Sequence, residues 1–246
     1  MSKSSKYILA GGCSFTNENF KSPWHPEMDF SYDKWPTILG DELNLLVKNL
    51  GANGLDNTQI YHRVATDIIE NHDKIELVVI GWSQHTRFMV YDNHDHHPSL
   101  YIKHLDKHKE TASNFTKSAI EYYRWIEDNN YLNEITIEVL FNRIYLIQKL
   151  CDNFGIKHLQ ASLCGQFNDR TIMNADSHMD IINAKSFSKV RRKNMIGWPF
   201  SKLLGGFEYD HTDKVHWVSD IDKHPNKKGH EEIAKLYYDK YKKIYL

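Results

Sequence analysis

The stretch that decides the fold covers residues 7–16 and reads YILAGGCSFT. Its first four residues, Tyr7–Ala10, form a short apolar run, and Gly11 and Gly12 follow directly. An apolar run of this length that ends in glycines is typical of a buried strand followed by a tight turn. We therefore expect a strand that ends just before Ser14.

Two further apolar runs have the same character. Leu45–Leu50 leads into the glycine loop Gly51–Gly54, and Leu77–Ile80 ends at Gly81. Such runs without polar alternation are typical of parallel strands that are covered on both faces. Between them, Thr58–Asn71 has apolar residues four apart, as expected of a helix with one buried face.

The remaining predicted elements continue this alternation of strands and helices. We expect a fourth strand over Lys157–Ala161 and further helices over Trp35–Leu43, Ser118–Asp128, Glu134–Phe154 and Lys228–Tyr245. Residues 162–221 give no assignment. Alternating strands and helices imply right-handed βαβ units, so we predict an α/β protein in which helices cover a parallel sheet of about five strands.

The length of the chain favours one domain. Its 246 residues suit a single α/β unit over residues 1–246, and a polar, irregular insertion is expected at about 91–133. Lys and Arg number 31 against 32 Asp and Glu, a balance that argues against nucleic acid as the main partner. The short basic run at 189–193 is expected to be a solvated surface, although it could contact an anionic substrate.

The same composition bears on location. No run approaches the ~20 apolar residues of a membrane span, and the apolar stretch near the N-terminus is too short for a signal peptide. The odd count of three cysteines, Cys13, Cys151 and Cys164, favours a reducing compartment. We expect a cytoplasmic protein.

Polar and glycine-rich loops follow three of the predicted strands. They are Gly12–Thr16, Asn49–Gly54 and Gly81–Gln84. The carboxyl ends of parallel strands lie at one edge of a sheet, where open α/β sheets bind their ligands. A fourth polar segment, Asp222–His230, lies just before the last predicted helix.

These segments contain what acyl transfer requires. Ser14 could act as the nucleophile, His224 as the base that takes its proton, and backbone N–H groups of glycine loops as donors to the oxyanion. The alternative for Ser14 is a helix cap, since serine after a strand often caps a helix. Cys13 could itself be a nucleophile, although a cysteine at the end of a buried strand is more often inert packing.

Together, the four segments resemble blocks I, II, III and V of the SGNH, or GDSL-like, hydrolases. The resemblance covers residues 6–90 and about 215–245, and the GCSFT motif with the GWS loop is similar to members encoded by bacteriophages. It implies a flavodoxin-like three-layer α/β/α sandwich with strand order 2-1-3-4-5. A phage origin would mean a viral protein made in the cytoplasm of a host cell.

The resemblance also implies an activity. The family cleaves esters of lipids, acetylated sugars and related compounds, so we expect a serine ester hydrolase acting on a small-molecule or carbohydrate ester, with no cofactor. Ser14 matches the nucleophile, His224 the general base and Gly54 an oxyanion donor beside the N–H of Ser14. The alternatives are an O-acyltransferase with the same site and a non-catalytic binding module with the same fold.

The sequence departs from the family pattern at two functional positions. Ser83 stands where the family has an oxyanion asparagine, so the third donor is expected to be the Ser83 hydroxyl, with Asn53 or Gln84 as alternatives. The usual Asp-x-x-His spacing is absent. Asp222 is favoured as the residue that orients His224, and Asp220 is the alternative.

Other side chains near these loops are candidates for substrate contact. We expect Trp82, Arg87 and Asn53 to contribute to substrate binding. The segment 93–97, NHDHH, contains residue types that bind zinc, but its spacing fits no pair on one helix face. A solvated loop is the favoured interpretation, and no metal site is expected.

Overall fold

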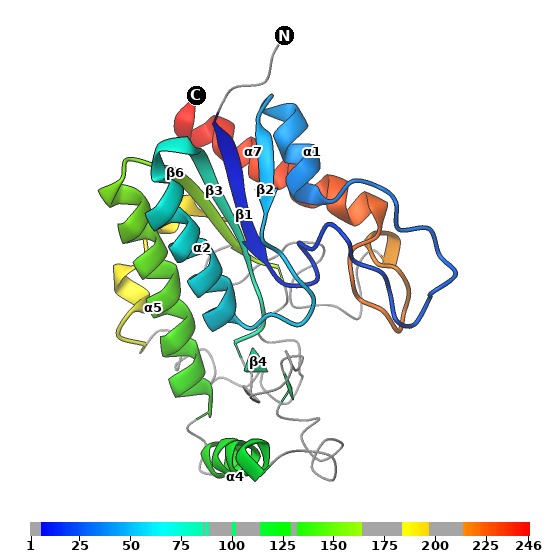
Figure 1. The fold of residues 1–246 in the computed structure, drawn as a ribbon, viewed down its shortest axis with the longest axis vertical. Coiled ribbons are helices and arrows are strands. Elements are labelled where there is room, and N and C mark those ends of the chain that lie inside the picture. The colour runs from blue at the N-terminus through cyan, green and yellow to red at the C-terminus, as the bar shows by residue number, and fades with distance from the viewer. Residues whose placement is uncertain are drawn as a thin grey trace.

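The computed structural model describes residues 6–85, 87–88, 100–101, 114–128, 132–163, 184–196 and 214–246. Within them, a five-stranded parallel sheet lies between helices on both of its faces (Figure 1). The predicted three-layer α/β/α sandwich is therefore confirmed. Whether the whole of residues 1–246 forms one domain stays a prediction.

The main sheet has the strand order β2-β1-β3-β6-β7, and every neighbouring pair is parallel. This order is the expected 2-1-3-4-5. The strands are β1 (Tyr7–Gly12), β2 (Leu46–Asn49), β3 (Ile75–Trp82), β6 (Lys157–Ser162) and β7 (Met195–Ile196). A separate antiparallel pair consists of β4 (Arg87–Phe88) and β5 (Leu100–Tyr101).

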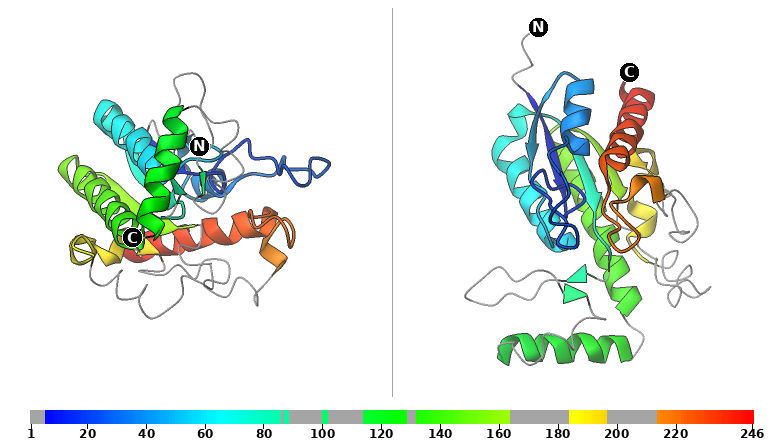
Figure 2. Two further views of the ribbon diagram at one scale, coloured as in Figure 1. Left: turned by 90° about the horizontal axis from the view of Figure 1, so that it is seen from below. Right: turned by 90° about the vertical axis from the view of Figure 1, so that its right-hand side faces the viewer.

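Four helices cover the sheet. Helices α2 and α5 pack together on one face, and α1 and α7 pack together on the other (Figure 2). A further helix, α4, lies within the predicted insertion and crosses near one end of α5 (Figure 1). The helices are α1 (Trp35–Glu42), α2 (Asn57–Asn71), α4 (Asn114–Asp128), α5 (Leu132–Asn153) and α7 (Lys227–Tyr245). None of the helices in the described ranges is long and apolar enough to cross a membrane.

Short 3-10 helices connect some of these elements. They are His72–Lys74, Phe187–Lys189, Arg192–Asn194 and Lys214–His216. The predicted segment 93–97 lies outside the described residues.

Close packing of helices on strand β1 explains part of its sequence. A Cβ atom on Gly11 would lie 2.4 Å from a methyl group of Val64 on α2, so only glycine permits this approach. On the other face, the indole of Trp35 on α1 stacks on the ring of Tyr237 on α7, with centroids 4.5 Å apart. The Tyr237 hydroxyl donates a 2.7 Å hydrogen bond to the carbonyl of Ile80.

Strand β6 contains a histidine that should make the fold sensitive to acid. His158 is 1% exposed, and among the described residues neither of its ring nitrogens has a hydrogen-bond partner. Burial, reinforced by the nearby Arg191, lowers the pKa of His158 from 6.5 to about 4. Between these two pH values the unfolded chain binds a proton that the folded chain does not bind.

We therefore expect His158 to make the free energy of unfolding fall by roughly 3 kcal/mol as the pH drops from 6.5 to 4. Urea unfolding at a series of pH values measures this, and His158→Leu, which has no titrating group, is the matched variant. The slope of stability against pH should be flatter for His158→Leu over this range. An identical slope in both proteins would contradict the prediction.

Candidate active site

Ser14 lies in a tight turn directly after β1. The backbone N–H groups of Thr16 and Asn17 donate to the carbonyl of Cys13 at 2.9 and 3.1 Å, and Ser14 is 7% exposed. No helix follows this turn before α1, because residues 13–34 form a long loop of short turns. Ser14 is therefore not a helix cap, and this alternative interpretation of the residue is wrong.

Three glycines from different segments pack around one buried residue, Thr16, which is 0% exposed. A Cβ atom on Gly12 would lie 2.0 Å from the Thr16 hydroxyl oxygen, and one on Gly81 would lie 3.2 Å from it. A Cβ atom on Gly51 would lie 2.8 Å from the Thr16 carbonyl carbon. The ends of β1 and β3 and the loop after β2 therefore meet at Thr16, two residues from Ser14.

The loop after β2 is fastened to the Ser14 turn by asparagine side chains. The Asn49 amide donates to the carbonyl of Thr16 at 2.7 Å and accepts from the N–H of Gly51 at 2.9 Å. The Asn17 amide donates to the side-chain oxygen of Asn53 at 2.9 Å. Gly54 follows with φ of +75°, a conformation that glycine adopts easily. The structure thus brings the Asn53–Gly54 turn beside the Ser14 turn.

A hairpin-like loop presents His224 from the other end of the chain. The N–H of Val218 donates to the carbonyl of His224 at 2.9 Å, and the N–H of Asn226 donates to the carbonyl of His216 at the same distance. The Asn226 side chain accepts from the N–H of Gly229 at 3.0 Å and so caps α7. The first turn of α7 therefore holds the C-terminal end of the loop that contains His224.

Ser14, His224 and Asp222 form one chain of hydrogen bonds. The Nε2 atom of His224 lies 2.8 Å from the Ser14 hydroxyl oxygen, and its Nδ1 atom lies 2.5 Å from a carboxylate oxygen of Asp222. The backbone N–H of His224 donates to the same carboxylate oxygen at 3.0 Å. Figure 1 shows the two segments, the blue loop after β1 and the orange loop before α7, side by side.

The Asp222 carboxylate is held in its ionised form. Its side chain is 1% exposed, and burial by itself raises the pKa of this carboxyl group. Hydrogen bonds from the His224 ring, from the Ser22 hydroxyl and from the His224 N–H outweigh that effect and lower the pKa from 3.8 to about 2. The group is therefore a buried anion at neutral pH, next to an imidazole that can carry positive charge.

Asp220, the other candidate for orienting His224, lies on the exposed side of the same turn. Both ring nitrogens of His224 are already engaged, Nδ1 by Asp222 and Nε2 by Ser14. The structure therefore brings Asp222, and not Asp220, to the imidazole.

Two aromatic rings flank the imidazole. Phe20 stacks on His224 with centroids 4.2 Å apart and planes 25° apart, and Phe15 contacts it at 5.0 Å with planes 48° apart. These contacts restrict the rotation of the ring, so its two nitrogens stay directed at Ser14 and Asp222. Sequence reasoning identified neither phenylalanine as part of the site.

The structure buries two of the predicted site residues. Trp82 is 0% exposed and donates its indole N–H to the side chain of Gln160 at 2.8 Å, so the expectation that its ring contacts substrate is wrong. Strand β3 continues two residues beyond the predicted end, and Trp82 belongs to the sheet core. Ser83 is also 0% exposed, and its role as an oxyanion donor stays a prediction.

Asn57 holds the loop that contains Ser83. Its buried amide accepts from the N–H of Ser83 at 2.8 Å and donates to the carbonyls of Ser83 and Gln84 at 3.0 and 3.2 Å. Sequence reasoning missed this residue because it lies on α2, 26 positions away. Arg87 is half-buried and donates weakly, at 3.5 Å, to the carbonyl of Leu55, next to Gly54.

Cys13 and the basic run are two further candidates that the structure describes. Cys13 is 0% exposed, which agrees with a packing role. Arg191 of the basic run forms an ion pair with Asp152. In the described part of the chain, no three potential metal ligands come together, whereas the predicted segment 93–97 is not described.

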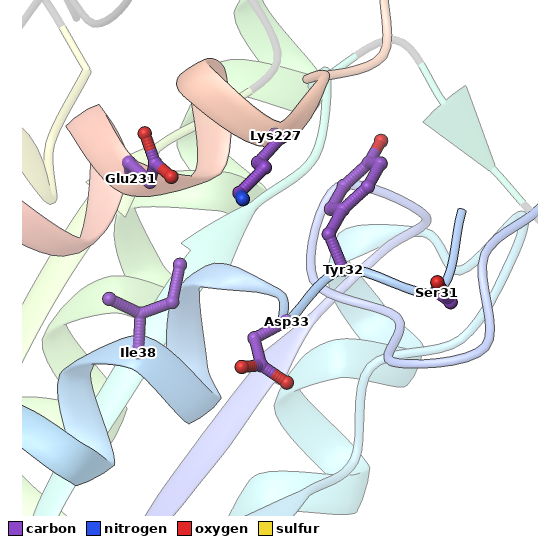
Figure 3. Close-up of a pocket in the computed structure, with 6 residues that line it drawn as sticks. All are labelled: Ser31, Tyr32, Asp33, Ile38, Lys227 and Glu231. Carbon is purple, nitrogen blue, oxygen red and sulfur yellow. The ribbon is translucent and has the colours of Figure 1, made fainter. Parts of the chain in front are cut away.

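A small pocket of about 270 Å³ lies beside the loop that presents His224 (Figure 3). It is lined by Ser31, Tyr32, Asp33, Ile38, Lys227 and Glu231. The Tyr32 hydroxyl donates to the carbonyl of Pro225 at 3.4 Å, next to His224. Burial, and then the charge of Asp222, raises the pKa of Tyr32 to about 12, so this hydroxyl keeps its proton and supports the loop.

Comparison with known proteins finds similarity at the level of structure. No known family profile matches the sequence, and no curated protein matches it. The psychrotrophic esterase EstA from Pseudoalteromonas sp., in a structure inhibited by monoethylphosphonate, has a TM-score of 0.51 and 11% identity over 97% of both chains. A protein from Lactobacillus plantarum has a TM-score of 0.50 and 13% identity over 98% of both chains.

A putative lipolytic protein of the G-D-S-L family from Desulfitobacterium hafniense has a TM-score of 0.49 and 14% identity, over 94% of this chain and 99% of that one. At these identities, the two comparisons with a TM-score of 0.50 or above bear on the fold alone. The chain shares the three-layer α/β/α architecture of EstA, and Ser14, His224 and Asp222 lie at the carboxyl edge of its sheet.

Proposed function

We propose that this protein is a serine ester hydrolase that works by two-step acyl transfer. The observation that supports this most strongly is the hydrogen-bonded chain from the Ser14 hydroxyl through the His224 imidazole to the buried Asp222 carboxylate. A nucleophile, a base and an acidic group that orients the base are the set that serine hydrolases use on unrelated folds.

In the first step, the Ser14 oxygen forms a bond to the ester carbonyl carbon while His224 Nε2 takes the hydroxyl proton. The bond between that carbon and the alcohol oxygen then breaks, and His224 gives the proton to the leaving alcohol. In the second step, water attacks the acyl-enzyme with His224 again as base, and Ser14 is released with its proton. Asp222 stays ionised throughout and stabilises the imidazolium.

The oxyanion requires donors at the same edge of the sheet. The N–H of Ser14 and the N–H of Gly54 are our proposed donors, because the Asn53–Gly54 turn is bonded to the Ser14 turn. The oxygen of the Asn53 amide accepts from Asn17, which leaves the amide nitrogen of Asn53 available to donate. Asn53 is exposed, whereas Ser83 is buried, so Asn53 is the better-placed third donor.

A fluorophosphonate probe tests the proposed function directly. The probe phosphonylates an activated serine, and the esterase EstA, whose fold this chain shares, is inhibited by a phosphonate. We expect stoichiometric labelling of the native protein, mapped by mass spectrometry to the peptide that contains Ser14, and hydrolysis of a short acyl ester that stops on labelling. Absence of both labelling and hydrolysis would favour a binding module over an enzyme.

The third oxyanion donor can be identified by a pair of substitutions. We expect Asn53→Ala to lower kcat by roughly 10²-fold with little change in KM, because the contact strengthens only in the transition state. Ser83→Ala should stay within a few-fold of wild type if the buried Ser83 hydroxyl is not the donor. Steady-state kinetics on one short acyl ester measure both values. The reverse ranking would return the role to Ser83.

A further inference from the structure

A buried lysine lies at the point where the long loop that contains Ser14 joins α1. Lys34 is 0% exposed and is the N-cap residue of α1. Its carbonyl accepts the N–H groups of Thr37 and Ile38 at 2.9 and 3.1 Å. Lysine is almost never fully buried unless its charge has a partner. The proposed acyl transfer uses no lysine, so this charge is stabilised by contacts outside the reaction itself.

The ammonium group of Lys34 is bonded to the loop that precedes it. Its Nζ atom donates to the carbonyls of Phe30 and Tyr32, each at 2.7 Å, and lies 4.2 Å from the centroid of the Tyr32 ring. An ammonium group has three N–H donors, and the face of an aromatic ring attracts a cation. Two carbonyls and one ring therefore take the place of water around this charge, and they tie the end of the loop to the start of α1.

The first residue held in this way reaches His224 through one other ring. The ring of Phe30 meets that of Phe20 edge to face, with centroids 5.7 Å apart and planes 87° apart. Phe20 in turn stacks on His224. Phe20 and Phe30 are 4% and 8% exposed, so close packing leaves little room for either ring to move. A displacement of Phe30 would therefore be passed on to the imidazole.

The second residue reaches the same histidine through the backbone. The Tyr32 hydroxyl donates to the carbonyl of Pro225, the residue that follows His224, at 3.4 Å. The Tyr32 ring also packs beside the ring of His230 on α7, with centroids 5.9 Å apart. The buried lysine thus holds one residue that leads to the face of the imidazole and another that leads to the backbone that carries it.

We propose that Lys34 is a positioning residue for the reaction. Its buried ammonium group fixes the end of the loop, and through the two aromatic residues that it binds it keeps His224 directed at Ser14. The proposal rests on the proposed function, because it assigns the lysine a part in the same site. A role in stability alone would leave the imidazole unaffected in a folded variant, whereas a positioning role requires the loss of the lysine to be felt at His224.

The test combines kinetics with proton NMR on the full-length protein. Lys34→Met nearly keeps the shape of the side chain and removes the charge and its donors. We expect kcat for a short acyl ester to fall about ten-fold with KM unchanged, because a less well aligned imidazole slows proton transfer without altering contacts to the substrate. The far-downfield resonance of the proton between His224 and Asp222, assigned by its absence in His224→Ala, should shift or broaden.

Lys157→Met is the matched control. Lys157 donates to the Glu76 carboxylate at 2.7 Å and to the Tyr241 hydroxyl at 3.1 Å. It lies at the N-terminal end of β6, whereas Ser14 follows the C-terminal end of β1 in the same parallel sheet. Both substitutions remove hydrogen bonds and should lower the midpoint of thermal unfolding. The control should leave kcat and the resonance as in wild type.

A double-mutant cycle tests whether the effect passes through the aromatic rings. Phe20→Leu removes the ring that stacks on His224. The loss of kcat caused by Lys34→Met should therefore be roughly three-fold or more smaller in the Phe20→Leu protein than in wild type, because coupled residues are not additive. Equal losses in the two backgrounds would overturn the proposed route.

If Lys34→Met does not fold, Lys34→Gln replaces it, because the amide keeps N–H donors but not the charge. A kcat within about two-fold of wild type, or an unchanged resonance, in the folded Lys34 variant would overturn the proposal. The proposed function has a separate failure. If the wild-type protein hydrolyses no ester and takes up no probe, the hydrolase assignment fails, whereas the resonance comparison still decides whether Lys34 positions His224.

Discussion

Replacing Ser14 with alanine is expected to lower kcat/KM for a short acyl ester by about 10⁴-fold or more, because the attacking oxygen is removed and residual catalysis can come only from the oxyanion donors. The substitution should leave the fold intact. The turn around Ser14 is closed by backbone hydrogen bonds to Cys13, and alanine keeps all of them.

Initial rates with wild-type and Ser14→Ala protein measure this loss, and thermal unfolding of both proteins is the control for folding. The transition midpoints should agree within a few degrees. A folded Ser14→Ala protein that retains near-wild-type esterase activity would disprove the proposed mechanism.

The second prediction with a large expected effect concerns Asp222, the residue that orients His224. Asp222→Asn is expected to lower kcat by about 10⁴-fold, because an amide at this position no longer fixes the Nδ1–H form of the imidazole or stabilises its positive charge. Asparagine matches aspartate in size, so the loss should come from chemistry and not from packing.

Asp220→Asn is the matched control for this prediction, two positions away on the exposed side of the same turn. It should retain activity within a few-fold of wild type. The reverse ranking of the two variants would transfer the orienting role to Asp220. Equal small losses would point to a Ser14–His224 dyad.

The sheet was predictable from sequence where its strands are long and apolar. Strands β1 and β3 are buried on both faces, so the apolar runs Tyr7–Ala10 and Leu77–Ile80 are unbroken, and glycine follows each run. Strand β7 was not predictable, because Met195–Ile196 is too short to show any pattern. Among the described residues, it joins the sheet through pairing with β6 alone.

The position of the β3 end explains one wrong prediction. Sequence reasoning ended this strand at Ile80, where glycine follows, and treated Trp82 as part of a loop. Gly81 instead continues the strand. The residue is glycine because Leu163 and Thr16 pack over its Cα atom and leave no space for a side chain. Trp82 therefore lies in the core, and a glycine that looked like a strand end is a packing site.

The sequence could not show which of Asp220 and Asp222 orients His224, because the answer depends on the geometry of a turn and not on residue spacing. The N–H of Ser219 bonds to the carbonyl of Asp222, and this turn directs the two carboxylates to opposite environments. Asn57 was missed for a related reason. Its contacts join segments far apart in the chain, and no local pattern marks an asparagine as the partner of a distant loop.

Ser14 and His224, whose side chains are hydrogen-bonded, are 210 residues apart in the chain. At about 5–20 residues per second, a ribosome makes His224 roughly 10–40 s after Ser14. During that interval the nascent chain carries a serine with no base beside it, which has no more reactivity than any other hydroxyl. Under the proposed function, hydrolysis can begin only when α7 has docked beside α1 and has brought His224 to Ser14.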